Sequence, residues 1–324
     1  MQADTTKTQG DAKVQVAAER LQRLRGYLAL DPHNHSLLID TAGAAIAANA
    51  WEEANGLAER CAEAGAPLPV RLRVQVLHHL GRLDEALALG AGDAAGDAKD
   101  PDLLGALSLV AMDARDIALS RRYAEQAGAG ADALSTLGLL ALDDGEAEAA
   151  ERLLDDALRQ RPDHPRALLG KGLKMLVGDG DPRAAAALLD RGAAAFGLHI
   201  GSWLAAGWAH LIAGDFTAAR DRFERALALD DRFAETQGSL AVLDLAEGRA
   251  DAAKRRADTA LRLDRNCLSA ALATSLILER AGKASVAERV REATLARPLA
   301  PGGRSIAEAM AVLGLGGRRA LNRR

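Results

Sequence analysis

Residues 200–233 read IGSWLAAGWAHLIAGDFTAARDRFERALALDDRF. Two runs rich in alanine and leucine meet at Gly214-Asp215 within this stretch. Alanine and leucine favour the helix, and a glycine after a helical run can adopt the left-handed conformation that ends it. The stretch therefore predicts two helices joined by a tight turn.

Features of this stretch recur further along the chain at a spacing of 34 residues. Two series of small residues have this spacing: Gly214, Gly248 and Gly282, and Ala219, Ala253 and Ala287. A fixed period of this size is typical of repeat proteins, and one helical hairpin cannot bury its own apolar face without neighbours. The predicted fold class is therefore all-α, an α-solenoid superhelix of about eight helix-turn-helix repeats.

The repeat unit resembles the tetratricopeptide repeat. The matching residues of residues 200–233 are Trp203, Ala206, Gly207, His210, Gly214, Ala219, Phe223 and Ala226. A second unit, which starts near Ala131, matches at Leu137, Gly138, Gly145, Ala150, Leu154, Ala157 and Pro162. The resemblance implies two antiparallel helices per repeat, small residues where the helices cross, and a first helix that lines the inner face of the superhelix.

The repeat register divides the chain into four predicted segments. Residues 1–11 are predicted to be disordered, 12–34 to form an N-terminal capping helix, 35–297 to form the repeat array, and 298–324 to form a break, a short capping helix at 306–313 and a basic tail. The repeats begin near His35, Pro67, Pro101, Ala131, Pro165, Ile200, Ala234 and Leu268. Glycines at 90, 92 and 96 predict that the second helix of the Pro67 unit frays.

The composition excludes some partners and favours one compartment. A net charge of -4 argues against a nucleic-acid partner, which requires a dominant basic surface. No apolar run reaches the roughly 20 residues that a membrane helix needs, so no membrane insertion is expected. The polar N-terminus and two distant cysteines, Cys61 and Cys267, predict a cytoplasmic protein. The alanine-, glycine- and arginine-rich composition suggests a bacterial source.

The histidines and acidic residues do not form a recognisable catalytic or metal site. His33 and His35 have no further ligand nearby, and His210 occupies a packing position of the repeat. A calcium loop starting at Asp179 would need a glutamate at its twelfth position, where Asp190 stands, so a solvated turn is favoured. We therefore predict no enzyme, no catalytic residue, no metal and no cofactor.

The register predicts a peptide-binding surface on the first helices. Residues three apart lie on one helix face. The candidate residues are Leu109, Met112, Leu139, Leu142, Asp143, Leu173, Leu176, Trp208, Leu211, Val242 and Leu245. An exposed apolar strip marks an interaction site, whereas part of this set can instead belong to the core between helices. Trp208 is the candidate anchor, because aromatic residues dominate binding hot spots.

The predicted function is a protein-interaction scaffold or chaperone-like adaptor that holds an apolar peptide or an amphipathic helix. The resemblance also implies that a carboxylate-binding clamp would use inward Lys, Arg and Asn residues. The corresponding positions carry Ile39, Gly43, Ser135, Leu139, Leu169, Leu204 and Gly238, with Arg71 as the one cation. Two alternatives stay open: a non-catalytic subunit of an enzyme complex, and a self-assembling structural solenoid.

Overall fold

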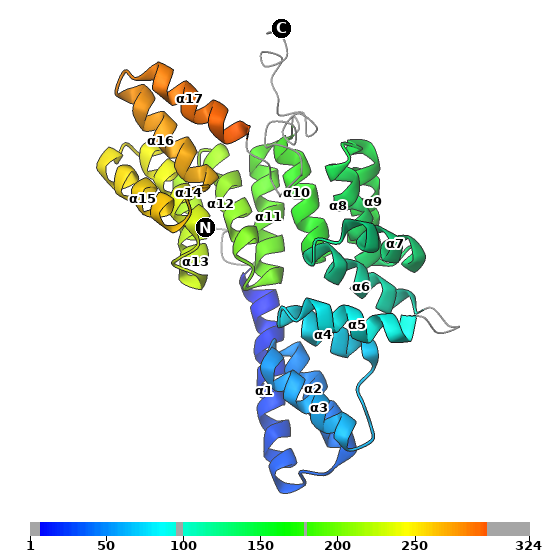
Figure 1. Cartoon of the computed structure of the whole chain (residues 1–324). Helices are drawn as coiled ribbons and strands as arrows, with labels where there is room; N and C mark the ends of the chain where they lie inside the picture. Colours follow the sequence, from blue (N-terminus) through cyan, green and yellow to red (C-terminus); the bar gives the residue numbers. More distant parts are fainter. Residues whose placement is uncertain (1–6, 95–99, 178–179, 297–324) are drawn as a thin grey trace. The chain divides into compact units, whose positions relative to one another are not determined.

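The computed structural model of the 324-residue chain describes residues 7–94, 100–177 and 180–296 (Figure 1). These residues form 17 helices and no strand. The helices are α1 (Lys7–Leu30), α2 (His35–Ala47), α3 (Trp51–Glu63), α4 (Val70–His79), α5 (Leu83–Ala94), α6 (Pro101–Asp113), α7 (Ile117–Ala127), α8 (Ala131–Asp143), α9 (Ala147–Gln160), α10 (Pro165–Val177), α11 (Pro182–Phe196), α12 (Ile200–Ile212), α13 (Phe216–Leu229), α14 (Ala234–Ala246), α15 (Ala250–Leu263), α16 (Leu268–Arg280) and α17 (Ala284–Leu295). The predicted all-α fold class is confirmed.

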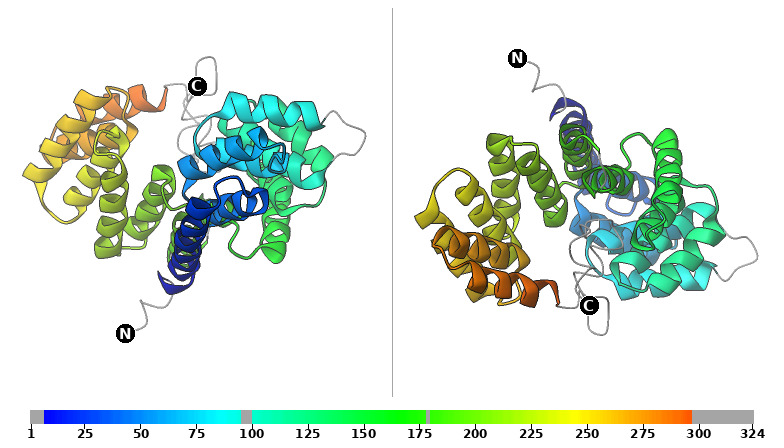
Figure 2. Two further views of the ribbon diagram at one scale, coloured as in Figure 1. Left: turned by 90° about the horizontal axis from the view of Figure 1, so that it is seen from below. Right: turned by 90° about the horizontal axis from the view of Figure 1, so that it is seen from above.

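The contacts divide the chain into two compact units. Unit 1 comprises Met1–Leu137 and Arg159–Arg161, and unit 2 comprises Gly138–Leu158 and Pro162–Arg324. In unit 1, α2 packs on α3, α4 on α5 and α6 on α7, and α1 packs on α2. In unit 2, α10 packs on α11, α12 on α13, α14 on α15 and α16 on α17 (Figure 2). Helices α11, α13 and α15 each contact the first helix of the next hairpin. Within each unit the helices therefore pack as adjacent pairs, as in an α-solenoid.

The turn between the two helices of a repeat has the predicted geometry. Gly145, Gly214, Gly248 and Gly282 have φ between 74° and 82°. Only glycine adopts this left-handed region without steric cost. The helix that follows the Gly214 turn is capped at its N-terminus. The side chain of Asp215 accepts a hydrogen bond from the backbone N–H of Ala218 and so caps α13.

Small residues allow the two helices of a repeat to cross closely. A Cβ placed on Gly207 of α12 would lie 2.4 Å from the ring of Phe223 of α13, which is fully buried. Such a distance is far inside van der Waals contact, so a larger residue would push the two helices apart. The small residue predicted at this crossing is confirmed.

Two helix boundaries differ from the sequence-based expectation. Helix α1 begins at Lys7, inside the segment predicted to be disordered, because extending a formed helix costs little. Helix α4 begins at Val70 and not at Pro67, because Pro69 disfavours a helical conformation for the residue before it. The predicted helix at 306–313 and the arginine-rich tail (Arg318, Arg319, Arg323 and Arg324) lie outside the described residues.

The prediction that α5 frays at its glycines is wrong for residues up to Ala94. Helix α5 continues through Gly90 and Gly92 to Ala94. A Cβ on Gly90 would lie 2.4 Å from Leu107 of α6, so the absence of a side chain lets α5 approach α6 closely. Packing against a buried leucine thus outweighs the low helix propensity of glycine.

Candidate peptide-binding surface

The first helices of the repeats in unit 2 carry apolar side chains that remain partly exposed to solvent. We call this set the apolar strip: Leu139, Leu142, Leu173, Leu176, Trp208 and Leu211. Leu173 is 39% exposed, and the other five are half-buried. Each of α8, α10 and α12 contributes two residues that are three positions apart and therefore share one helix face. The strip can contact a ligand without unfolding of the helices that carry it.

Trp208 is fixed by its neighbours within unit 2. Its indole N–H donates a hydrogen bond to the hydroxyl of Ser239 at 3.0 Å. Its ring meets the ring of Phe223 edge to face, with centroids 6.1 Å apart. The polar atom of this side chain is therefore already satisfied, and the part left for a ligand is the apolar ring.

Two of the predicted contact residues, Val242 and Leu245, offer almost no surface. Val242 is 8% exposed and Leu245 is 2% exposed. Both belong to a cluster of apolar side chains that is packed against Trp208 and Leu211 of α12 and Leu276 of α16. At α14 the same repeat positions therefore serve the core of unit 2.

The predicted residues of unit 1 lie on α6. Leu109 and Met112 are half-buried. Asp113 is exposed and lies 2.7 Å from Nε2 of His78, a residue of α4. Next to this pair, the ring of His79 stacks on Trp51 with centroids 3.8 Å apart. In unit 1 the apolar pair thus has a polar and aromatic border.

Sequence reasoning missed two apolar residues that are more exposed than most of the strip. Ile212, the last residue of α12, is 57% exposed, and Leu272 of α16 is 38% exposed. Ile212 follows Trp208 by four positions, and Leu272 precedes Leu276 by four, so each shares a helix face with a half-buried apolar residue of its own helix. Helical spacing would have found both if more than two positions per repeat had been used.

A charged cluster joins α11, α12 and α13. The carboxylate of Asp190 accepts hydrogen bonds from Arg222 at 2.7 and 3.0 Å and lies 3.0 Å from Nε2 of His210. Burial raises the pKa of Asp190, but the bonds to His210 and Arg222 outweigh it and hold the pKa below its usual value. Asp190 thus links three helices, and Asp179, at which a calcium loop would start, lies outside the described residues.

The described residues contain no group of three or more His, Cys, Asp or Glu side chains that could hold a metal ion. Cys61 and Cys267 are buried free thiols. Burial raises the pKa of Cys267 to about 12, so the reactive thiolate is strongly disfavoured. No described helix is both long enough and apolar enough to cross a membrane.

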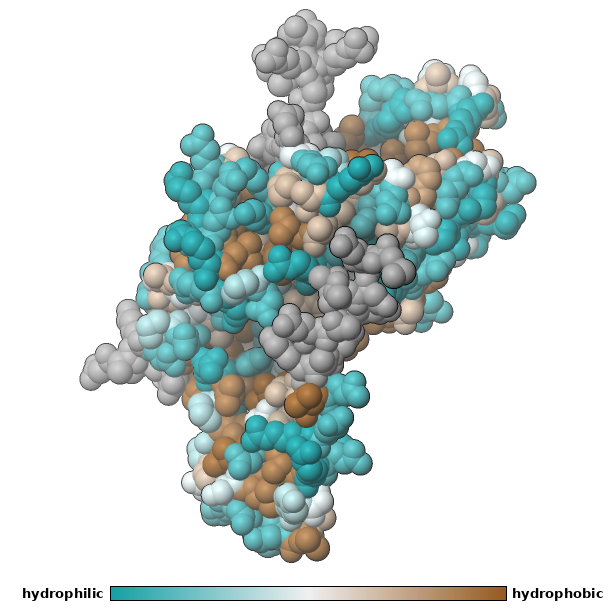
Figure 3. All heavy atoms as spheres, turned by 180° about the vertical axis from the view of Figure 1, so that it is seen from behind, coloured by the Kyte–Doolittle hydropathy of each residue, from teal (hydrophilic) through white to brown (hydrophobic). Residues whose placement is uncertain are grey.

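The surface of the molecule mixes apolar and polar patches. On the face in Figure 3, hydrophobic residues gather in patches that hydrophilic residues separate. A patch of this kind, rimmed by polar side chains, is typical of protein-binding surfaces.

Comparison with known proteins agrees with the helix pairs described above. A family model described as tetratricopeptide repeat matches residues 210–276. A second model with the same description matches residues 135–173 and 176–232. No match is found among the curated proteins.

Several solved structures are similar in fold. A chain of the APC/C hetero-tetramer Cut9-Hcn1 has a TM-score of 0.63 at 17% identity. The alignment covers 92% of the present chain and 58% of that Cut9-Hcn1 chain. A monomeric mutant of IFIT1 with Gppp-AAAA has a TM-score of 0.55 at 13% identity, covering 84% of this chain and 75% of its own. MamA aligns over 49% of this chain and 92% of the MamA chain at 21% identity, with a lower TM-score of 0.39.

The fold and its repeated hairpins define an α-helical repeat protein. The chain contains tetratricopeptide repeats, as the resemblance predicts, and the family matches lie within residues 135–276. Repeats of this kind in general support a role as a scaffold for protein interactions. The chain spans less than two thirds of the Cut9-Hcn1 chain that it resembles.

Proposed function

We propose that the chain is a protein-interaction scaffold or chaperone-like adaptor that binds an apolar peptide or an amphipathic helix on its first helices. The observation that carries the proposal is the partial exposure of the apolar strip in a tetratricopeptide-repeat protein. Burying such side chains against a partner releases about 25 cal/mol for each Å² of apolar surface.

The exposed residues favour a helical ligand. Leu173 on α10 and Ile212 on α12 present aliphatic side chains, and Trp208 presents a ring whose N–H is already bonded. An amphipathic helix offers apolar residues at intervals of three and four positions, which match a row of apolar side chains better than a charged tail does. Tryptophan is also among the residues that are enriched at binding hot spots.

Site-specific photo-crosslinking tests this proposal. A photoreactive residue at Leu173 is expected to crosslink to partner segments that are apolar or amphipathic, identified by mass spectrometry of the crosslinked peptides. The matched control is Ala187, which is exposed on α11, a second helix. Equal crosslinking at both positions, or only hydrophilic segments at Leu173, would contradict the assignment.

The change Leu173→Asp, which introduces a negative charge, tests the energetic part of the proposal. Because Leu173 is 39% exposed, the variant is expected to fold. We expect its affinity for the crosslinked segment to fall about tenfold, since a buried unpaired charge at an interface costs about 1.4 kcal/mol or more. Ala187→Asp should leave the affinity unchanged in the same calorimetric titration.

The proposal includes a cytoplasmic setting and a non-catalytic role. The two buried free thiols support a reducing environment. Cell fractionation tests the location, and a substrate screen with the purified chain tests the absence of catalysis. The two alternatives are a non-catalytic subunit of an enzyme complex and a self-assembling solenoid, and light scattering over a concentration series separates the latter from a monomeric scaffold.

A further inference from the structure

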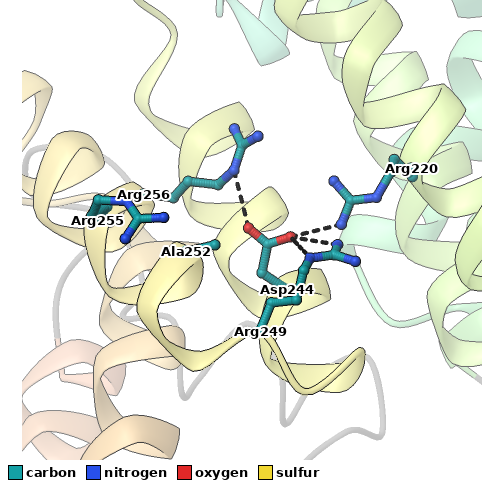
Figure 4. Close-up of a pocket in the computed structure, with 6 residues that line it drawn as sticks. All are labelled: Arg220, Asp244, Arg249, Ala252, Arg255 and Arg256. Carbon is teal, nitrogen blue, oxygen red and sulfur yellow. Dashed lines mark hydrogen bonds and ion pairs between the residues drawn. The ribbon is translucent and has the colours of Figure 1, made fainter.

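Unit 2 has a basic pocket that is formed by residues other than those of the apolar strip. Its volume is about 540 Å³, and its lining residues are Arg220, Asp244, Arg249, Ala252, Arg255 and Arg256 (Figure 4). They come from α13, from α14, from the turn after it and from α15. We call it the arginine pocket.

Asp244 fixes three of the arginines. Its side chain is 3% exposed. One carboxylate oxygen accepts hydrogen bonds from Arg220 at 2.7 Å and from Arg249 at 2.7 and 3.2 Å, and the other accepts from Arg256 at 3.1 Å. Figure 4 shows the three guanidinium groups around this carboxylate. The buried aspartate thus holds the three cations in one place and restricts their side-chain freedom.

The arginines keep donors that these bonds do not use. A guanidinium has five N–H groups, and Arg256 uses two of its nitrogens to donate hydrogen bonds to Asp244 and Gln237. Among the residues that the structure describes, none forms an ion pair with Arg255. Ala252 lies between Arg255 and Asp244 in the view of Figure 4, and its short side chain leaves room there.

The charges leave the pocket positive. Four arginines and one aspartate line it. Glu247 pairs with Arg220 and Arg249, and the exposed Glu224 lies 3.8 Å from Arg220. One positive charge remains in excess after these three carboxylates are counted, and Arg255 carries it at the lining. An oxygen-rich anion supplies the acceptors and the negative charge that this arrangement lacks.

We propose that the arginine pocket binds an oxyanion on an acidic segment of a partner peptide, either a carboxylate or a phosphate group. Bidentate recognition of both groups is the characteristic use of arginine. The peptide part of this proposal rests on the scaffold function proposed above, whereas the oxyanion part rests on the pocket alone. The apolar strip and the arginine pocket then select two different features of a partner.

Calorimetric titration with short peptides tests the pocket independently of the apolar strip. The probes are three peptides of glycine and serine, in which the central residue is phosphoserine, glutamate or serine, in a buffer free of phosphate and sulfate. Because they contain no apolar side chain, failure of the apolar strip cannot alter the result. We expect saturable binding of at least one anionic peptide and none of the serine peptide.

Two arginine variants on α15 locate the binding. Arg255→Ala should weaken binding about tenfold, since it removes a charge-assisted contact. Arg262→Ala, two turns further along the same helix and outside the lining, should have no effect. Circular dichroism checks that both variants fold, which is expected because Arg255 joins no described ion pair.

The results of these titrations either support or overturn the proposal. Binding of only the phosphoserine peptide, or only the glutamate peptide, supports it and identifies the group. The proposal is overturned if neither anionic peptide binds, if the serine peptide binds equally well, or if both variants lose the same affinity. The last result would mean that general charge attraction, and not the pocket, holds the peptide.

Discussion

Arg115 adopts a backbone conformation that a side chain disfavours. It follows the first helix of the Pro101 unit and has φ of 62°, where the Pro67, Ala131, Ile200, Ala234 and Leu268 units have glycine. The left-handed region costs a residue with a Cβ about 1 kcal/mol or more. The helix nevertheless ends there, because the N–H of Arg115 bonds to the carbonyl of Met112 and that of Asp116 to the carbonyl of Ala111.

We expect Arg115→Gly to stabilise the protein. Relief of the left-handed strain outweighs the extra freedom of glycine in the unfolded chain, and the net gain is about 0.5 to 1 kcal/mol. Urea unfolding of both proteins measures it as a higher midpoint at the same slope. Asn49→Gly is the control: Asn49 has φ of 57°, but asparagine tolerates this region, so its gain should be smaller.

At the scale of the element, Asp190 connects three helices by charge. It belongs to α11, His210 to α12 and Arg222 to α13. Because the folded pKa of Asp190 lies below the usual value of 3.8, the carboxylate stabilises the fold above that pH. This contribution is lost as the pH falls through the depressed folded value.

The change Asp190→Asn is expected to lower the free energy of unfolding near neutral pH by about 1 to 3 kcal/mol, because charge-assisted bonds from Arg222 are lost. The difference from the unaltered protein should shrink as the pH falls below the usual value of 3.8 and through the lower pKa of folded Asp190, because Asp190 itself becomes neutral. Urea unfolding across this range measures it. Asp221→Asn, at a carboxylate that is 52% exposed, should show a much smaller difference at neutral pH; an equal loss would contradict the assigned role of Asp190.

The sequence predicted most elements because their signals are local. Seven of the eight predicted first helices begin at the predicted residue, since glycine turns and prolines mark helix ends directly. The exception, at Val70, depended on a second proline two positions after Pro67. The helix that continues through Gly90 depended on Leu107, a residue of another hairpin, which no local signal reveals.

The candidate site was less predictable because burial depends on both neighbouring hairpins. Leu173 and Val242 occupy equivalent positions, but Leu173 is 39% exposed and Val242 is 8% exposed. Side chains of α12 and α16 cover Val242, including the large ring of Trp208. The partners of Asp244 likewise come from three segments that are adjacent only in the folded chain, so composition and spacing did not indicate the arginine pocket.

At the scale of the whole molecule, a stack of hairpins is held together mainly by contacts between neighbours. Stability in such a protein is a sum of the stability of each repeat and of the interfaces between adjacent repeats. Within unit 2, α13 contacts α12 and α14, while α14 contacts α15 and α16. A defect in α13 should therefore weaken its neighbours most and decline along the chain.

Phe223→Ala tests this expectation. Phe223 is fully buried and fills the space beside Gly207, so its truncation leaves a cavity that costs about 3 to 5 kcal/mol. Hydrogen exchange with mass spectrometry should show the largest loss of amide protection in α12, α13 and α14, and a smaller loss in α17. Phe223→Leu, which retains much of the volume, should show the same pattern with a smaller amplitude. A uniform loss across unit 2 would mean that these hairpins unfold as one cooperative block, because nearest-neighbour coupling then extends over the whole unit.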